Sequence, residues 1–256
     1  MHPILIEFGF LNLKIFTYGL LVASGFFAGV LLAARWGRQD GLDPQKILDL
    51  CFYIALGALV GARGLYIVVE YRYFLDNPIE VLKFWKGGLV FYGGFLGAAA
   101  VAWYYMGKHQ LPVWKVADVL APCLAVGQAI GRWGCFFAGC CYGVKTDVPW
   151  AITFTNPKSL APLDIALHPT QIYLSLNALI IFGILAWVRK RKTFDGQVFW
   201  IYGILYSIGR FIIEFYRGDD RGYAVEEILS TSQFIGIFVL AFSIFMFVKL
   251  RSQRPA

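Results

Sequence analysis

Seven long apolar stretches divide this chain of 256 residues, and each is long enough to cross a lipid bilayer as a helix. They run approximately over residues 14–35, 48–70, 88–106, 114–137, 169–188, 197–216 and 228–249. Only 15% of the residues are charged, whereas a water-soluble domain carries about 25%. The sequence therefore predicts an all-α integral membrane protein built as a bundle of seven transmembrane helices.

The distribution of lysine and arginine predicts how this bundle is oriented. Basic residues lie mainly in the short loops, and alternate loops place the larger share on one side. The positive-inside rule then puts the N-terminus outside and the C-terminus in the cytoplasm. Segments 71–87 and 138–168 become small outer-face elements, and the first has the alternation expected of an interfacial amphipathic helix. The net charge of +7 forms no single basic patch, so we expect no nucleic-acid partner.

Three arginines interrupt the apolar stretches: Arg63, Arg132 and Arg210. A charged side chain near the bilayer centre costs roughly 2.5–3.5 kcal/mol, so such residues mark functional sites. At about 1.5 Å per helical residue, all three are expected some 7–11 Å below the outer boundary. Tyr18, Tyr92 and His168 fall near the same level. This layer suits a buried site for negative charge, and the abundant anion in a membrane is lipid phosphate.

The sixth stretch places Tyr206, Arg210 and Glu214 on one helix face, because they are four positions apart. We expect Glu214 to keep Arg210 charged and oriented while leaving part of its guanidinium free. Arginine suits phosphate because its planar fork can donate two parallel hydrogen bonds. In the alternative interpretation, the arginines pair with Glu70, Glu214 or backbone carbonyls and only hold the bundle together.

The fourth stretch carries glycines on one side and leads into three cysteines. Gly127, Gly131 and Gly134 predict that a neighbouring backbone approaches this helix closely. The cysteines are Cys135, Cys140 and Cys141. They leave three alternatives open: a membrane thiol-redox enzyme that uses these cysteines, a metal site that also includes His168, and a channel or transporter for an anionic solute.

The run from Gly131 to Gly143, GRWGCFFAGCCYG, resembles the signature of prolipoprotein diacylglyceryl transferases. Further blocks similar to family features follow the family's order along nearly the whole chain. They are Tyr18-Gly19, Gly87-Gly88 with Phe91-x-Gly93-Gly94, Asp118 with Ala121-Pro122, His168-Pro169-Thr170-Gln171-x-Tyr173, and Tyr206-x-x-x-Arg210-x-x-x-Glu214-Phe215.

The resemblance implies an enzyme that takes phosphatidylglycerol and attaches its diacylglyceryl group to the lipobox cysteine thiol of a prolipoprotein, releasing glycerol-1-phosphate. It implies a bacterial inner membrane location with a periplasmic N-terminus, and no metal or dissociable cofactor. Residues 1–256 are expected to form a single transmembrane catalytic domain.

The expected site joins the residues above into one group. The resemblance assigns phosphate and head-group binding to Arg132 and an essential catalytic position to Arg210, and the depth of Arg63 adds it as a supporting cation. The expected catalytic residues are Arg210, Glu214, Tyr206 and His168. The expected phosphatidylglycerol-binding residues are Arg132, Arg63, Tyr18, Tyr92, Gly93, Gly131, Gly134 and Gly143.

The sequence departs from the well-studied enterobacterial form at three positions. That form has histidine, asparagine and glutamate where Tyr92, Cys135 and Cys140 stand. The histidine has been proposed there as a catalytic base, and a phenol with an ordinary pKa near 10 is a poor base at neutral pH. His168 is the alternative proton acceptor, although it equally suits a cap before Pro169. The general base therefore stays open.

Overall fold

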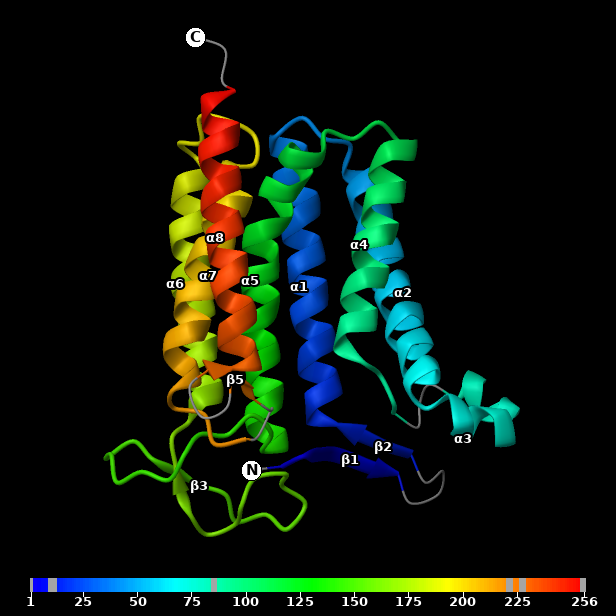
Figure 1. The fold of residues 1–256 in the computed structure, drawn as a ribbon, viewed down its shortest axis with the longest axis vertical. Helices are drawn as coiled ribbons and strands as arrows, with labels where there is room; N and C mark the ends of the chain where they lie inside the picture. The colour runs from blue at the N-terminus through cyan, green and yellow to red at the C-terminus, as the bar shows by residue number, and fades with distance from the viewer. Residues whose placement is uncertain (1, 9–12, 84–86, 220–222, 226–228, 254–256) are drawn as a thin grey trace. The chain divides into compact units, whose positions relative to one another are not determined.

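The computed structural model describes the whole chain except residues 1, 9–12, 84–86, 220–222, 226–228 and 254–256. The long helices of the described part are α1 (Thr17–Gln39), α2 (Pro44–Val69), α4 (Phe91–Lys108), α5 (Val113–Ala138), α6 (Thr170–Arg189), α7 (Gln197–Glu214) and α8 (Thr231–Ser252) (Figure 1). They match the predicted stretches to within a few residues. The predicted all-α membrane fold is therefore confirmed.

Five of these helices, α1, α2, α5, α6 and α8, are long and apolar enough to cross a membrane. The other two have 18 residues each; α4 ends in a lysine and α7 contains an arginine and a glutamate. That all seven helices cross the membrane stays a prediction.

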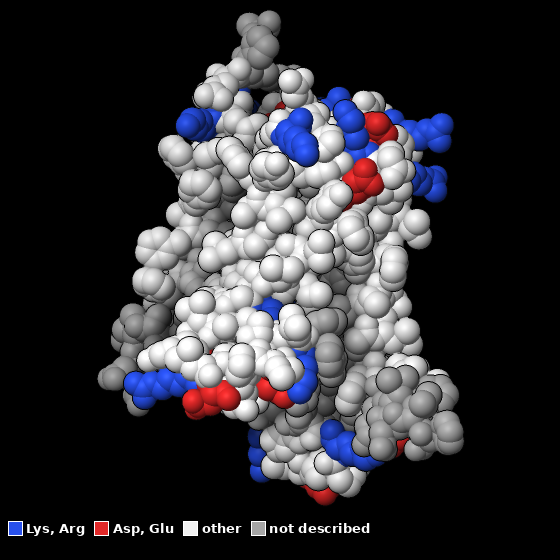
Figure 2. Space-filling model, turned by 90° about the vertical axis from the view of Figure 1, so that its right-hand side faces the viewer, with Lys and Arg blue, Asp and Glu red and all other residues white. Residues whose placement is uncertain are grey.

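The helix exteriors are apolar, as a bilayer requires. Phe27, Leu31, Phe95, Trp103 and Ile180 each expose more than half of their surface. On the face shown in Figure 2, charged side chains lie mainly near helix ends, and most of the surface between them is uncharged. Lipid can cover such a surface without burying charge.

The chain forms two compact units. Unit 1 contains residues 1–32 and 117–256, and unit 2 contains residues 33–116. The single catalytic domain expected over residues 1–256 stays a prediction.

Unit 1 gathers short strands at one end of its helices (Figure 1). Three antiparallel pairs form there: β1 (Ile4–Phe8) with β2 (Leu13–Phe16), β3 (Ile152–Thr153) with β4 (Ala166–Leu167), and β5 (Tyr223–Val225) with β6 (Leu229–Ser230). The connection between α6 and α7 lies at the opposite end.

Glycines let α1 and α5 approach closely in unit 1. A methyl group on Gly25 would lie 2.7 Å from the carbonyl oxygen of Gly127, and one on Gly134 would lie 3.1 Å from that of Tyr18. Small residues allow this backbone contact where lipid gives no hydrophobic drive for association. The close approach predicted for the glycine face of residues 114–137 is confirmed.

Facing glycines also let α2 and α4 pack closely in unit 2. A methyl group on Gly61 or Gly93 would collide with the carbonyl oxygen of the other, and Gly57 and Gly97 are paired in the same way. Gly93 therefore has a packing role that requires glycine.

Segment 71–87, which the sequence predicts as an outer-face element, differs from the single amphipathic helix expected there. It forms two short helices, α3 (Tyr71–Asp76) and the 3-10 helix η1 (Pro78–Leu82). Pro78 starts the second one, since proline has no N–H to continue a helix from the preceding turn. Phe74 is buried, whereas Ile79 and Leu82 are exposed. Phe84 and Trp85 lie outside the described residues.

A buried carboxylate caps the N-terminus of α7, at the end of unit 1 opposite the strands. The Asp118 side chain is fully buried and accepts hydrogen bonds from the backbone N–H groups of Gly196 (2.9 Å) and Phe199 (3.0 Å). Lys192 Nζ lies 3.2 Å from the same carboxylate. Asp118 thus caps α7 and links it to α5.

We expect Asp118→Ala to lower the free energy of unfolding by about 3–5 kcal/mol, because it removes the buried partner of Lys192 and leaves the N–H groups of Gly196 and Phe199 without their acceptor. Thermal denaturation in detergent measures the loss. Asp195→Ala is the matched control, because Asp195 pairs with the same Lys192 but is half exposed. It should cost about 0–1 kcal/mol. Equal effects of the two variants would contradict this role of Asp118.

Candidate functional site

A buried ion pair lies near the end of α7. Arg210 Nη1 lies 2.7 Å from Glu214 Oε2, one helical turn further on, and their side chains are 10% and 7% exposed. The pair predicted from their spacing is therefore present. Because its partner is so close, Arg210 stays charged in a largely apolar bundle.

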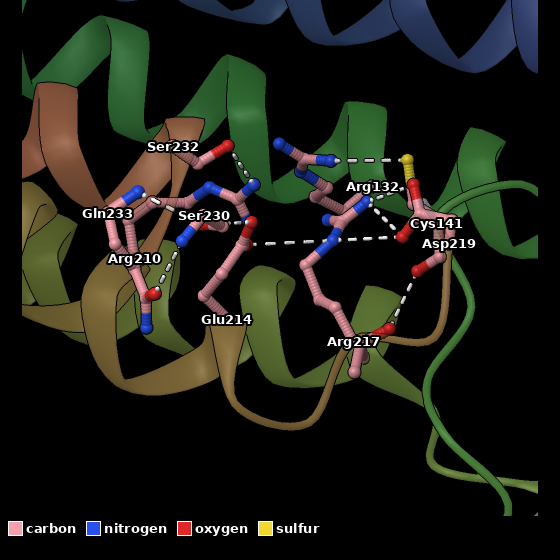
Figure 3. Close-up of polar contacts among 10 residues, drawn as sticks. Arg132, Cys141, Arg210, Glu214, Arg217, Asp219, Ser230, Ser232 and Gln233 are labelled. Atoms are coloured by element: carbon pink, nitrogen blue, oxygen red, sulfur yellow. Dashed lines mark hydrogen bonds and ion pairs between the residues drawn. The ribbon is translucent and has the colours of Figure 1, made fainter. Parts of the chain in front are cut away.

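The start of α8 holds this ion pair from the other side (Figure 3). Ser230 and Gln233 form a capping box, and the Ser230 hydroxyl donates to Glu214 Oε1 (3.1 Å). Arg210 Nη2 donates to the Ser232 hydroxyl (3.2 Å). The loop into α8 thereby orients both charged groups, although these serines were not among the predicted residues.

Arg217 is a second buried arginine, and the sequence analysis missed it. Its side chain is 3% exposed; Nε lies 3.0 Å and Nη2 2.6 Å from Asp219 Oδ1, and Nε lies 3.7 Å from Glu214 Oε2. The signal was present, because Arg217 continues the helix face of Tyr206, Arg210 and Glu214 by three positions. Because Arg217 comes directly after the predicted apolar stretch 197–216, it is not among the charged residues found inside the stretches.

The environment keeps Arg217 charged. Burial lowers the pKa of its guanidinium, but hydrogen bonds with Asp219 and with the Cys141 side chain more than offset this, so the pKa is raised from its usual value. The Nη1 atom is buried and has no oxygen acceptor among the described residues. This part of the guanidinium can donate to an additional anion.

Arg132, in the last two turns of α5, has a different environment. Its Nη1 atom lies 3.9 Å from Cys141 Sγ, a weak contact (Figure 3). Within the described part of the chain, no carboxylate lies within ion-pair distance of Arg132. It is therefore the member of this group whose positive charge is least compensated.

The loop after α5 is fixed by α6. Thr170 and Gln171 are fully buried; Thr170 Oγ1 donates to the carbonyl of Cys141 (2.6 Å) and Gln171 Nε2 donates to that of Cys140 (2.8 Å). The polar side chains at the start of α6 thus hold the loop beside Arg217.

Gly143 joins this loop to the segment after α7. Its N–H donates to the carbonyl of His168 (3.0 Å), and its backbone pairs with that of Arg217. A methyl group on Gly143 would lie 2.5 Å from the His168 carbonyl oxygen and 2.6 Å from that of Tyr216. Only glycine fits there, and the contact positions Arg217.

Together these contacts form what we call the arginine cluster: Arg132, Arg210, Arg217, Glu214 and Asp219. Arg132 and Arg217 both interact electrostatically with Arg210. Among the described residues, these three guanidinium groups and two carboxylates leave one net positive charge in a mostly buried setting. Such a cluster matches one monoanionic phosphodiester and can stabilise charge that grows on it.

Other predicted residues of unit 1 lie around this cluster. Tyr206 stacks on Tyr202, with ring centroids 5.8 Å apart, one turn before Arg210. Tyr18 is 45% exposed and packs against Gly134. A methyl group on Gly131 would meet only Val22, at 4.0 Å, so there is open space beside this glycine.

His168 lies beside the cluster and makes its polar side-chain contact elsewhere. Its Nδ1 is 3.0 Å from the hydroxyl of Tyr173, and that hydroxyl accepts from Trp150 Nε1 (2.7 Å). The His168 ring packs edge-on against Tyr216. It does not cap α6 by a side-chain hydrogen bond; the residue before that helix is Pro169.

The three predicted residues of unit 2 have structural contacts. The Arg63 guanidinium donates to the carbonyls of Gly87 (2.8 Å), Val81 (3.2 Å) and Glu80, and lies over the Tyr66 ring. These contacts favour the interpretation in which Arg63 holds the fold together. Tyr92 is 53% exposed, and Gly93 packs against α2.

The fold and the cluster define a class: a helical membrane protein with a buried cationic site suited to an anionic lipid. The family model for prolipoprotein diacylglyceryl transferase matches residues 3–249. The chain is 40% identical to the phosphatidylglycerol–prolipoprotein diacylglyceryl transferase of Clostridium tetani, over 96% of this chain and 97% of that protein. It is 35% identical to a second such enzyme of Clostridium perfringens (92% and 91%) and 36% identical to that of Synechococcus elongatus (94% and 85%).

The chain belongs to the prolipoprotein diacylglyceryl transferase family. It is therefore a membrane transferase of lipoprotein biosynthesis, and the thiol-redox alternative is not supported as its main activity.

We expect Gly143→Ala to destabilise the protein by about 1–3 kcal/mol, because the added methyl group overpacks a backbone contact. Transfer activity should fall by more than the loss of folded protein explains, since the added methyl group also displaces Arg217. Thermal denaturation and a transfer assay on the same preparation separate the effects. Gly183→Ala, in open space on α6, is the control and should lower neither stability nor activity. Wild-type activity in Gly143→Ala would contradict the positioning role.

Proposed function

We propose that the arginine cluster is where this transferase binds the phosphate of phosphatidylglycerol and transfers its diacylglyceryl group to the lipobox cysteine of a prolipoprotein. The observation that carries this assignment is the single excess positive charge of the buried cluster. A phosphodiester monoanion neutralises it, and neutralisation repays the cost of holding an uncompensated guanidinium in an apolar bundle.

In the proposed reaction the substrate thiol sulfur attacks the glycerol carbon that carries the phosphate. A C–S bond forms and the C–O bond to phosphate breaks, so the products are a thioether-linked diacylglyceryl protein and glycerol-1-phosphate. Negative charge grows on the departing phosphate. Fixed guanidinium groups therefore stabilise the transition state more than the ground state.

The arginines have different roles in this proposal. Arg132 binds the phosphate, because no carboxylate of the described residues competes for it. Arg210 is the catalytic cation, and Glu214, Ser230 and Ser232 orient it. Arg217 adds a buried guanidinium whose Nη1 atom has no oxygen acceptor in the described part of the chain.

Other predicted residues support binding of the lipid or accept the proton of the substrate thiol. Tyr206 and Tyr18 flank the cluster, and Gly131 leaves space along α5 for the lipid, whereas Gly134 holds α5 against Tyr18 of α1. His168 is the candidate proton acceptor for the substrate thiol. If its Nδ1 carries the hydrogen of the contact with Tyr173, Nε2 is left as the basic atom.

The proposed location is the bacterial inner membrane, with the N-terminus and the arginine cluster on the periplasmic side. The cluster lies at the strand-bearing end of unit 1, whereas Lys190, Arg191 and Lys192 follow α6 at the other end. The positive-inside rule places these basic residues in the cytoplasm.

Arg132→Ala tests the assignment most cleanly, because it removes a charge without leaving a carboxylate unpaired. We expect transfer from labelled phosphatidylglycerol to a lipobox peptide to fall by at least about 100-fold, as when a transition-state donor is lost. Arg210→Ala should do the same, and a peptide with serine in place of cysteine should accept nothing. Arg251→Ala, an exposed arginine at the end of α8, is the control and should keep normal turnover. Normal turnover in Arg132→Ala would contradict the site.

Reporter fusions test the orientation. Alkaline phosphatase requires disulfides and is active only in the periplasm. Fused after residue 157, between α5 and α6, it should be active, and fused at the C-terminus it should be inactive. The reverse pattern would overturn the proposed topology while leaving the chemistry of the cluster unaffected.

A further inference from the structure

Three cysteines form a compact group beside the arginine cluster, and the transfer reaction gives them no task. The sulfur atoms of Cys135, Cys140 and Cys141 all lie within 4.8 Å of one another, and none of the three is in a disulfide bond. We propose that these residues form a three-thiolate site for a soft monovalent metal ion, for which copper(I) is the fitting ion.

The spacing of the sulfurs suits trigonal coordination. Metal–thiolate bonds of roughly 2.3 Å place three sulfurs about 4 Å apart around a central ion. The observed group therefore needs only a small contraction, which side-chain rotation can supply. Among the common first-row metals, soft thiolates favour copper(I) and zinc.

The backbone that carries the sulfurs is fixed in advance. The N–H of Cys140 donates to the carbonyl of Cys135 (3.1 Å), and the carbonyls of Cys140 and Cys141 accept from the fully buried Gln171 and Thr170. Cys141 has φ +60°, a left-handed conformation that is costly for a residue with a side chain. Little ordering entropy remains to oppose metal binding.

The composition of the group favours a monovalent ion over zinc. Structural zinc sites take four protein ligands in tetrahedral geometry, and a zinc site with three protein ligands needs a water to complete it. In the described part of the chain, the group contains three cysteines and no histidine or carboxylate. His168, which the sequence offers as a further ligand, lies outside this group.

The neighbouring guanidinium groups stabilise the loaded state. When a monovalent ion binds, the three thiols release three protons to solvent, and the complex then carries two negative charges. Cys141 Sγ lies 3.9 Å from Arg132 Nη1 (Figure 3), and Cys141 also interacts electrostatically with Arg217. These two arginines offset the negative charge of the complex.

This arrangement has a consequence for catalysis that rests on the proposed function. Arg132 attracts both the thiolate complex and the lipid phosphate. Metal and phosphatidylglycerol therefore bind antagonistically, and copper(I) inhibits transfer. Because the two anions share one arginine, each should weaken the affinity for the other by the same factor.

The test measures copper(I) binding to the reduced, full-length protein in detergent by competition with a chromophoric copper(I) chelator. We expect one equivalent per chain, with three sulfurs at roughly 2.3 Å in X-ray absorption. Cys135→Ser, Cys140→Ser and Cys141→Ser should each weaken binding by more than about 100-fold, since a ligand contributes at least as much as its supporting contacts. Cys51→Ser and Cys123→Ser, which alter buried cysteines outside the group, are the matched controls and should leave affinity unchanged.

Several results would overturn the site. The first is a wild-type protein that loses all its copper(I) to the chelator, and the second is equal loss of affinity in the control and cysteine-group variants. The others are an X-ray absorption spectrum that shows four ligands around copper, and tighter binding of zinc than of copper(I). A disulfide that persists in the reduced preparation between two cysteines of the group would also overturn it.

The inhibition experiment separates this site from the proposed function. Copper(I) binding without any diacylglyceryl transfer would keep the metal site and reject the transferase assignment. Transfer that copper(I) does not inhibit, in protein that binds one equivalent, would reject the antagonism through Arg132.

Discussion

The structure depends on charges that are buried in pairs inside a protein made for lipid. An isolated guanidinium in this setting is strongly unfavourable, so each buried arginine must be matched by carboxylates, carbonyls or a ligand. Arg210 is matched by Glu214 and Arg217 by Asp219. In the described part of the chain, Arg132 contacts a thiol and no carboxylate, and the five residues of the cluster keep one positive charge. That imbalance turns a structural network into a binding site for an anion.

The rest of unit 1 holds this network in place. Asp118 caps α7 at one end, so the helix that carries Arg210 is anchored away from the site. Gly25 and Gly127 let α1 lie against α5, and Gly143 links the loop after α5 to the segment of Arg217. These contacts depend on small residues and on a buried carboxylate. In a membrane the hydrophobic effect does not hold helices together, so they must associate through close packing and hydrogen bonds.

The cysteine group includes two positions, Cys135 and Cys140, where the enterobacterial form has other polar residues. Three thiols beside an arginine with no carboxylate partner among the described residues give this chain a soft-metal chemistry that its main reaction does not use. The two chemistries meet at Arg132, because a thiolate complex and a phosphate are both anions. A site evolved for one anion can thus be regulated by another without any change of fold.

The sequence by itself determined the helices, the membrane class, the Arg210–Glu214 pair and the glycine contact of α5, because each depends on periodicity or spacing along one helix. Only the tertiary structure decided which partners come from elsewhere in the chain. Arg217 and Ser232 join the cluster through loops, while Arg63 is satisfied by carbonyls of a segment more than 15 residues away. Spacing along a helix is local and can be read from residue order. Contacts made through loops depend on the path of the chain in three dimensions, and the spacing of residues along the sequence does not give that path.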